Sequence, residues 1–265
     1  MLGKVMKYEF LATARQFIPA YIAVMVLAII NGVLLWAGGD RGISQALVTG
    51  TGNWAVATNG LLMAFYILMI YSIAILTTVL IIRRFYVSMF KDEGYLTHTL
   101  PVSTDTLLFG KLLTAVCWSI ISTVVVSISF LIFIGPWISE VWSDMIVLLS
   151  FDFGLSGLLI GIPTMLAGVA SSYLAFYSAL SIGSLAKRRK ISLAIGVYMG
   201  YGFIAWLVVF IFLLHAGPDV FDALFSHPDT VFDNLMLVML GISLVYAAIH
   251  YFIARAILKN KLNLE

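Results

Sequence analysis

One serine and one histidine of the chain are candidates for the nucleophile and the base of a hydrolase. Ser156 stands in Gly154-Leu155-Ser156-Gly157, and His250 lies near the C-terminus. A serine and a histidine act as nucleophile and base only when they approach to ~2.6–3.2 Å. Both residues lie in long apolar stretches that run in the same direction, Ser156 near the start of its stretch and His250 well inside its own. At 1.5 Å per helical residue they are about 20 Å apart in depth, so we expect no catalytic dyad.

The segment 215–234 contains residue types that bind metals. These are His215, Asp219, Asp222, His227, Asp229 and Asp233. Their spacing matches no closed metal-binding motif, and Pro218 and Pro228 interrupt the segment. We predict a solvated outer loop without a metal site, with the alternative that part of it forms a short helix at the membrane interface.

An acidic and aromatic cluster lies within the segment 83–111. Its residues are Lys91, Asp92, Glu93, Gly94, Tyr95 and Leu96. We expect a helix to run to about Phe90, Gly94 to end it with a positive φ, and Leu100-Pro101 to force an extended or turned backbone. Ser103 or Thr104 can then cap the next helix, with Asp105 in its first turn. The segment is predicted to be an elbow that presents a docking surface. The alternative is a plain connector.

A second charged feature is the run Lys187-Arg188-Arg189-Lys190. Such a run is found at phosphate and nucleic-acid sites, but it is also what a short cytoplasmic loop between two membrane helices contains. The net charge of the chain is only +2, which gives no sign of a nucleic-acid partner. We therefore interpret the run chiefly as a topology determinant, with a secondary contact to a cytoplasmic partner as the other interpretation.

The composition places these features in a membrane protein. The chain has 265 residues, of which 62% are hydrophobic and 11% charged, and its mean hydropathy is +1.06. Soluble domains are ~45–50% apolar and ~25% charged, so a soluble enzyme is excluded. Six stretches without Asp, Glu, Lys or Arg are long enough to span a bilayer. They are 17–37, 60–82, 112–134, 154–186, 191–214 and 235–254. We predict an all-α integral membrane protein with six transmembrane helices in a single domain, 1–265.

The basic residues predict the orientation of this bundle. With both termini in the cytoplasm, fourteen of the fifteen Lys and Arg residues lie on the inner side, and only Arg41 lies outside. Cytoplasmic loops of membrane proteins carry such an excess. The pairs Gly157–Gly161 and Gly196–Gly200 have the spacing at which small residues let membrane helices approach closely.

Residues 1–16 are predicted to form an interfacial amphipathic helix on the inner leaflet. At helical spacing, Leu2, Met6, Phe10 and Phe17 share one face and Lys4, Lys7 and Arg15 the opposite one. Such a helix buries its apolar face at the headgroup boundary and offers cations to anionic lipid. The alternative is a frayed tail that only supplies positive charge.

The spans contain almost no ionisable residues. His250 is the only histidine in the six stretches, and no Asp, Glu, Lys or Arg accompanies it. Uncharged polar residues are present, among them Asn31, Thr77, Thr78, Thr164, Ser171 and Ser172. Ion-coupled carriers and channels usually keep ionisable residues inside the membrane. The composition therefore disfavours ion coupling and suits an amphipathic, lipid-like or peptide cargo. We expect a lone buried His250 to be hydrogen-bonded.

Two stretches resemble a known family. The sequence from Asp92 to Ser103, with Leu107-Leu108 and Lys111-Leu112-Leu113, is similar to the first cytoplasmic loop of bacterial ABC transporter permeases of the type-2 exporter class. The stretch from Lys7 to Arg15 resembles the opening helix of these permeases. The resemblance implies a bacterial cytoplasmic-membrane protein whose loop, here Lys91 to Leu96, couples to a separate ATPase subunit. It also implies a second permease subunit, identical or related, and ATP and Mg bound by the ATPase.

The absence of a phosphate-binding loop agrees with this division of labour. The Gly-Lys pairs Gly3-Lys4 and Gly110-Lys111 are followed by Val5 and Leu112, not by Ser or Thr. We expect this chain to bind no cofactor of its own and to catalyse no reaction. Two alternatives remain. Gly154-Leu155-Ser156-Gly157 is similar to the Gly-x-Ser-Gly motif of rhomboid intramembrane proteases, although the residues around His250 are not small. The other alternative is a carrier that does not use ATP.

Overall fold

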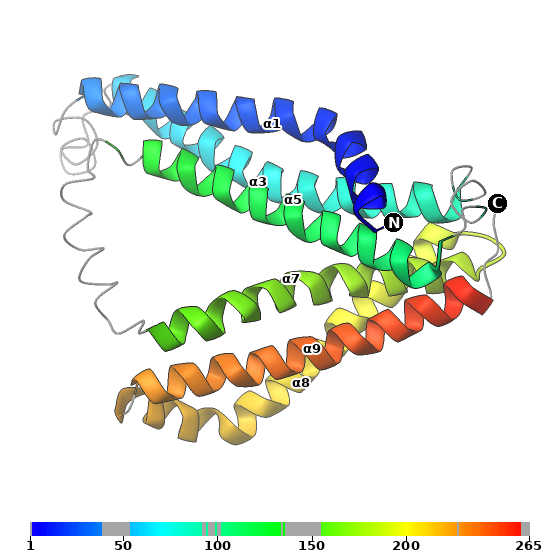
Figure 1. Ribbon diagram of the computed structural model, residues 1–265. Coiled ribbons are helices and arrows are strands. Elements are labelled where there is room, and N and C mark those ends of the chain that lie inside the picture. The colour runs from blue at the N-terminus through cyan, green and yellow to red at the C-terminus, as the bar shows by residue number, and fades with distance from the viewer. Residues whose placement is uncertain are drawn as a thin grey trace. The chain divides into compact units, whose positions relative to one another are not determined.

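The computed structural model describes residues 2–38, 54–91, 94, 99, 102–133, 135, 155–226 and 228–260 (Figure 1). Of these described residues, 96% are helical and none is in a strand. The helices are α1 (Leu2–Gly38), α3 (Trp54–Phe90), α5 (Thr104–Phe133), α7 (Leu155–Ser184), α8 (Lys190–Ser226) and α9 (Pro228–Asn260). The predicted all-helical class is therefore confirmed.

All six predicted spans coincide with helices that are long and apolar enough to cross a membrane. The helices are longer than the uncharged stretches that predicted them, with 37 residues in α1 and 30 in α5. α1 has no break at residue 17, so residues 2–16 continue directly into the first span. α3 ends at Phe90, as predicted. Several charged residues that adjoin the predicted spans, among them Arg15, Arg84 and Lys111, thus lie within helices rather than in loops.

The prediction of a loop over 215–234 is wrong for most of its length. α8 continues to Ser226 and α9 begins at Pro228, so the two helices approach within two residues of each other. Proline is favoured at the first position of a helix because its missing N–H has no intrahelical acceptor there. Pro228 therefore starts α9 instead of interrupting a loop. Among the described residues, no group of three or more metal-binding side chains comes together.

The chain divides into two compact units, each described here by itself. The second unit comprises 10–80 and 117–150, and so contains most of α1, most of α3 and the later part of α5. Its packing includes Tyr66, which stacks on Phe133 with ring centroids 4.9 Å apart and bonds the hydroxyl of Ser129 at 3.0 Å. α1 and α5 approach closely at Gly32, where an added Cβ would lie 2.9 Å from the carbonyl oxygen of Ile132.

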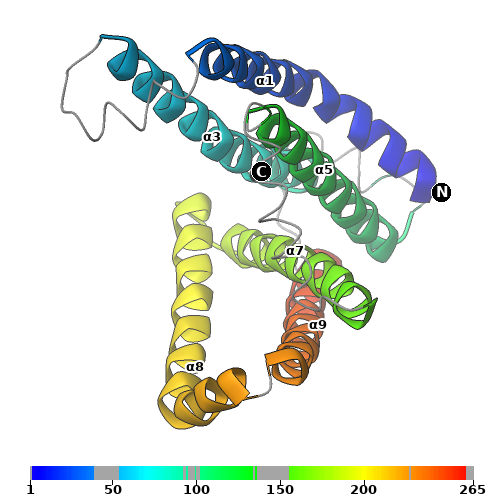
Figure 2. The same cartoon turned by 90° about the vertical axis from the view of Figure 1, so that its left-hand side faces the viewer.

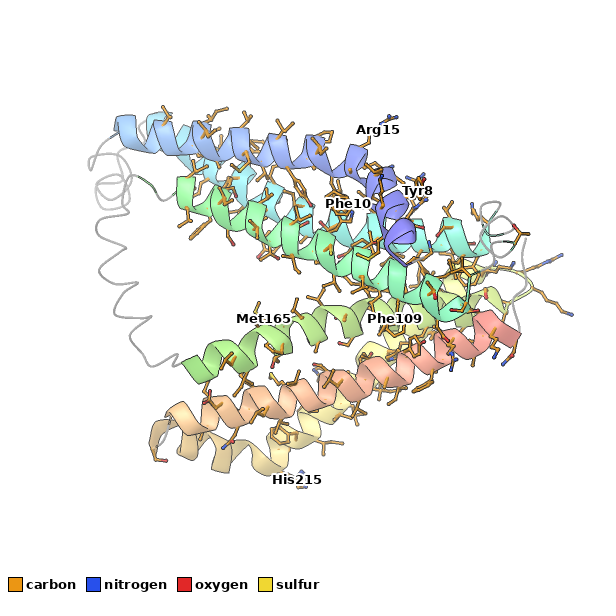
Figure 3. All side chains as sticks on the ribbon, viewed as in Figure 1. Tyr8, Phe10, Arg15, Phe109, Met165 and His215 are labelled. Atoms are coloured by element: carbon orange, nitrogen blue, oxygen red, sulfur yellow. The ribbon has the colours of Figure 1, made fainter. Side chains whose placement is uncertain are left out.

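Part of the face of α1 predicted to meet lipid is covered by protein. The rings of Phe10 and Phe17 both stack on Trp118 of α5, each with a centroid distance of 4.2 Å. Phe17 is completely buried. On the other side, Tyr8 and Arg15 are exposed and point away from the helix (Figure 3). The apolar face of α1 is therefore used, at these two positions, for helix packing. That residues 1–16 lie in the membrane interface stays a prediction.

The first unit comprises 1–9, 81–116 and 151–265. It contains α7, α8 and α9 together with the end of α3 and the start of α5. Figure 2 shows α7 and α9 side by side, while α8 leaves α7 after their common turn and meets α9 at its other end. The turn is tight because at Gly183 an added Cβ would lie 2.6 Å from the carbonyl oxygen of Lys190 and 2.7 Å from the Cβ of Ala194. Only glycine allows this approach.

Three of the four glycines in the predicted pairs make no close approach within the described part of the chain. A Cβ at Gly161, Gly196 or Gly200 would meet no atom within 4 Å. Close approaches between helices occur instead at Gly32 and Gly183. The spacing of small residues predicts that helices can approach, but the facing residue decides where they do.

Candidate coupling site

The predicted elbow joins α3 to α5. Asp92, Glu93, Tyr95 and Leu96 lie outside the described residues. Lys91 is exposed, and Gly94 is buried, helical and donates its amide to the carbonyl of Lys91 at 2.7 Å. α3 ends at Phe90, so Gly94 does not terminate it as predicted.

The start of α5 has the predicted cap. The hydroxyl oxygen of Ser103 accepts the amide of Thr106 at 3.2 Å, and its carbonyl accepts the amide of Leu107 at 3.1 Å. Ser103 is therefore the N-cap, and Asp105 lies in the first turn, where the helix dipole favours an acid.

An ion cluster, here called the Glu9 cluster, joins three helices next to the elbow. It consists of Glu9, Arg84, Ser88 and Lys111. The two carboxylate oxygens of Glu9 accept from different partners, Nζ of Lys111 at 2.6 Å and Nε of Arg84 at 2.8 Å. Nζ of Lys111 also donates to Oγ of Ser88 at 2.5 Å, and that hydroxyl donates to the carbonyl of Arg84 at 2.6 Å. α1, α3 and α5 are thereby fixed to one another at this level.

The ion pair between Glu9 and Lys111 matters for stability because both side chains are buried or nearly so. The side chain of Lys111 is only 4% exposed and that of Glu9 13%. Removal of one partner from a buried ion pair leaves an uncompensated charge and costs about 3–5 kcal/mol. Arg84 and Ser88 are four residues apart on α3 and so lie on the same face of the helix. The Glu9 cluster therefore needs the correct relative register of all three helices.

A second group, here called the Asp105 cluster, joins the start of α5 to the end of α9. It consists of Asp105, Tyr251 and Arg255. Arg255 binds the carboxylate of Asp105 through two nitrogens, with Nε 2.6 Å from Oδ1 and Nη2 2.8 Å from Oδ2. The hydroxyl of Tyr251 donates to Oδ1 at 2.7 Å. Bidentate pairing of this kind fixes orientation as well as distance.

Aromatic contacts lie beside both clusters. Phe85, next to Arg84 on α3, stacks on Tyr177 of α7 with a centroid distance of 3.8 Å. Phe109 on α5, labelled in Figure 3, contacts Tyr251 with a centroid distance of 5.1 Å. α3 and α5, on either side of the elbow, thus have aromatic contacts to α7 and α9, and the contact to α9 is also charged.

The basic run lies in the turn between α7 and α8. Lys187, Arg188 and Arg189 are exposed, and Lys190 is the first residue of α8. Arg189 has φ 56°, a conformation that costs a non-glycine residue about 1 kcal/mol or more. Its carbonyl accepts the amide of Leu193 at 3.1 Å and so starts α8. This compact turn presents three cations to solvent. Its role as topology determinant or secondary contact stays a prediction.

His250 has a partner other than Ser156. Its Nδ1 lies 2.8 Å from the hydroxyl oxygen of Ser178, and the rings of Tyr201 and Tyr246 meet it edge-on. The expectation that this buried histidine is hydrogen-bonded is confirmed. Ser156 precedes Ser178 in the same helix by about 33 Å along the axis. This distance argues against a dyad of Ser156 and His250.

The interactions of the two clusters were not predicted from sequence. The sequence predicts Arg84 and Arg255 only as topology determinants, and Asp105 only as a residue of the first turn of its helix. The sequence does contain one indication that Glu9 has a specific partner, since no other acid occurs in the first 39 residues. A single acid inside a helix that otherwise carries cations indicates a specific pairing. Its partners could not be identified, because Lys111 is separated from Glu9 by 102 residues.

In comparisons with known proteins, no family model, curated protein or solved structure matched the chain. The functional argument therefore rests on the residues and contacts described above.

Proposed function

We propose that the chain is the membrane-spanning permease subunit of an ATP-driven ABC exporter of a bacterial cytoplasmic membrane. A separate ATPase subunit docks at Lys91 to Leu96, the central part of the elbow, and supplies ATP and Mg. Both termini are cytoplasmic, residues 1–16 lie along the inner leaflet, and a second permease subunit completes the pathway. Two features support the proposal. One is the set of six helices long and apolar enough to span a membrane, and the other is the resemblance of the elbow residues to a coupling loop.

The observation that carries the proposal is the attachment of the elbow. The Glu9 cluster holds α3 before the elbow through Arg84 and Ser88, and α5 after the elbow through Lys111. The Asp105 cluster also holds the start of α5, and the distances in the two clusters are 2.5–2.8 Å. A plain connector between two membrane helices does not require charged anchors at both ends. A segment that receives force from a partner protein does, because a loosely held loop would absorb the movement.

The polar residues of the spans support an uncharged pathway. Several of them bond to their own helix, as Asn31 does to the carbonyl of Leu27 at 2.9 Å and Thr78 to that of Ala74 at 3.0 Å. Thr77 shares a hydrogen bond with Ser122 at 3.0 Å. Bonds of this kind satisfy polar groups without binding an ion. They favour an amphipathic, lipid-like or peptide substrate that is moved outward.

The most exposed span supports a second permease subunit. In the span 190–212 of α8, Phe203, Trp206 and Phe210 are all well exposed within this chain. Large aromatic side chains on a membrane helix either meet lipid or pack on another subunit. We assign this face to the second permease subunit, with lipid filling the remainder.

A double substitution at the elbow tests the proposal. Glu93→Ala with Tyr95→Ala should abolish co-purification of the ATPase or uncouple ATP hydrolysis from transport. Loss of one buried interface anchor costs about 2 kcal/mol, roughly 30-fold in affinity. The matched control is Lys187→Ala with Arg188→Ala, which removes two exposed cytoplasmic side chains and should preserve assembly. Full assembly and transport in the elbow variant, with loss in the control, would place the docking site at the α7–α8 turn.

A further inference from the structure

We propose that the Glu9 and Asp105 clusters are the two routes by which movement of the elbow reaches the membrane helices, one to α1 and the other to α9. This inference rests on the proposed function, because it names the residues through which the docked ATPase acts. It assigns positioning roles to Glu9, Lys111, Asp105 and Arg255. These residues lie outside the predicted docking surface.

The two clusters have the same plan. In each, one or two charged residues that flank the α3–α5 connection pair with a charged residue of the first or the last helix. Lys111 and Arg84 pair with Glu9 of α1, and Asp105 pairs with Arg255 of α9. All of these residues lie in the same compact unit, which includes 1–9, 81–116 and the whole of α9. The elbow therefore has one charged connection to each terminal helix.

The chemistry of the clusters suits the transmission of movement. Hydrophobic attraction is non-directional, whereas a bidentate Arg–carboxylate pair fixes the orientation of its two partners as well as their distance. Arg255 holds Asp105 in this way. The carboxylate of Glu9 is divided between two cations on two different helices, so a shift of either α3 or α5 pulls on α1. Each cluster therefore resists relative displacement of the helices that it joins.

The two routes are separable, because the clusters share no residue. A substitution in one should interrupt movement of its own terminal helix and leave the other helix responsive. A general loss of stability would instead affect both helices. This difference distinguishes a positioning role from a merely structural one.

The test uses the purified complex with its ATPase in lipid vesicles of phosphatidylethanolamine and phosphatidylglycerol, in a Cys117→Ser background. Single cysteines replace Arg15 on α1 or Lys259 on α9, which are both exposed. The rate of labelling by a polar maleimide is measured with ATP–Mg and without it. In the otherwise unchanged protein, ATP should alter the rate at both positions, by about five-fold or more.

Glu9→Gln should abolish the ATP-dependent change at position 15 and preserve it at position 259. Asp105→Asn should do the reverse. Because Glu9→Gln leaves two cations without their anion, the exchanged pair Glu9→Lys with Lys111→Glu serves as the second variant. Arg84→Gln is added to it, because Arg84 also binds Glu9 and would otherwise face a cation. This variant restores opposite charges at positions 9 and 111 and should recover the change at position 15. Lys7→Gln, which removes an exposed charge from α1, should leave both changes intact.

Two results would overturn the inference, provided that the ATPase still co-purifies. In one, Glu9→Gln and Asp105→Asn both retain the ATP-dependent changes at positions 15 and 259. In the other, each variant loses both changes. Absence of an ATPase from the complex with the unchanged chain would overturn the proposed function, and the inference with it. Failure of the exchanged pair to recover the change at position 15, although that variant assembles, would also contradict the role of the Glu9–Lys111 pair.

Discussion

At the scale of the residue, pairing partners determine what a polar side chain does in this protein. The position of Lys111 next to a predicted span indicates a role in membrane topology. In the structure, however, Lys111 is buried and bound to Glu9 and Ser88. His250 is the partner of Ser178 and not of Ser156. The residue types and the burial of His250 could be predicted from sequence. The partners could not, because they depend on which faces of distant helices meet.

The hydrogen bond of His250 gives a prediction about stability. Ser178→Ala should lower the free energy of unfolding by about 1–3 kcal/mol, since it leaves a buried imidazole nitrogen without its partner. Ser172→Ala on the same helix is the control. Ser172 is exposed and bonds only to the carbonyl of Gly168, so its loss should change stability by less than about 0.5 kcal/mol. Thermal unfolding in detergent measures both. Equal effects of the two substitutions would refute the pairing.

At the scale of the element, hydropathy predicts where helices cross the membrane but not where they end. The six uncharged stretches lie in helices that are long and apolar enough to cross a membrane, but each predicted span excludes charged residues that the helices include. α1 and α5 include Glu9 and Lys111 because these charges satisfy each other. The loop predicted over 215–234 failed for a related reason. Acids and prolines disfavour a helix interior, but Pro228 occupies a first position, where proline is favoured.

The turn between α7 and α8 yields a prediction about an element boundary. Gly183→Ala should destabilise the protein by about 1–3 kcal/mol, because the added Cβ meets backbone atoms of Lys190 and Ala194 that cannot easily move. Gly168→Ala, also on α7, adds a Cβ in open space and should stabilise by about 0.5–1 kcal/mol. Opposite signs are expected in thermal unfolding. A neutral Gly183→Ala would mean that the two helices do not approach there.

At the scale of the whole molecule, the positions of the basic residues predict the orientation, while the structure defines two compact units. The division could not be predicted from sequence, because α1, α3 and α5 each contribute to both units. The elbow, whose flanking residues 81–116 belong to the unit with α7–α9, was predicted as a docking surface from its residue types. Its two charged anchors come from tertiary contacts that span 75 to 150 residues.

The orientation is tested with single cysteines in a Cys117→Ser background. Cysteines at Ser44, Ser139 and Ser226 should react with an impermeant thiol reagent on intact cells, because these positions are predicted to lie outside. Cysteines at Ser103 and Ser192 should react only after the cells are opened. Labelling of Ser103 on intact cells would reverse the orientation, and an elbow outside the cell could not meet an ATPase.

The central claim is that an ATPase subunit docks at the elbow, and a photoreactive residue tests it most directly. A benzophenone amino acid replaces Tyr95 in the full chain, the cells are irradiated, and mass spectrometry identifies the cross-linked protein. The account predicts a partner that contains Gly-x-x-x-x-Gly-Lys-[Ser/Thr], with no such cross-link when the same residue replaces exposed Tyr8. A cross-link to an ATPase from Arg188 but not from Tyr95, or from neither position, would contradict the account.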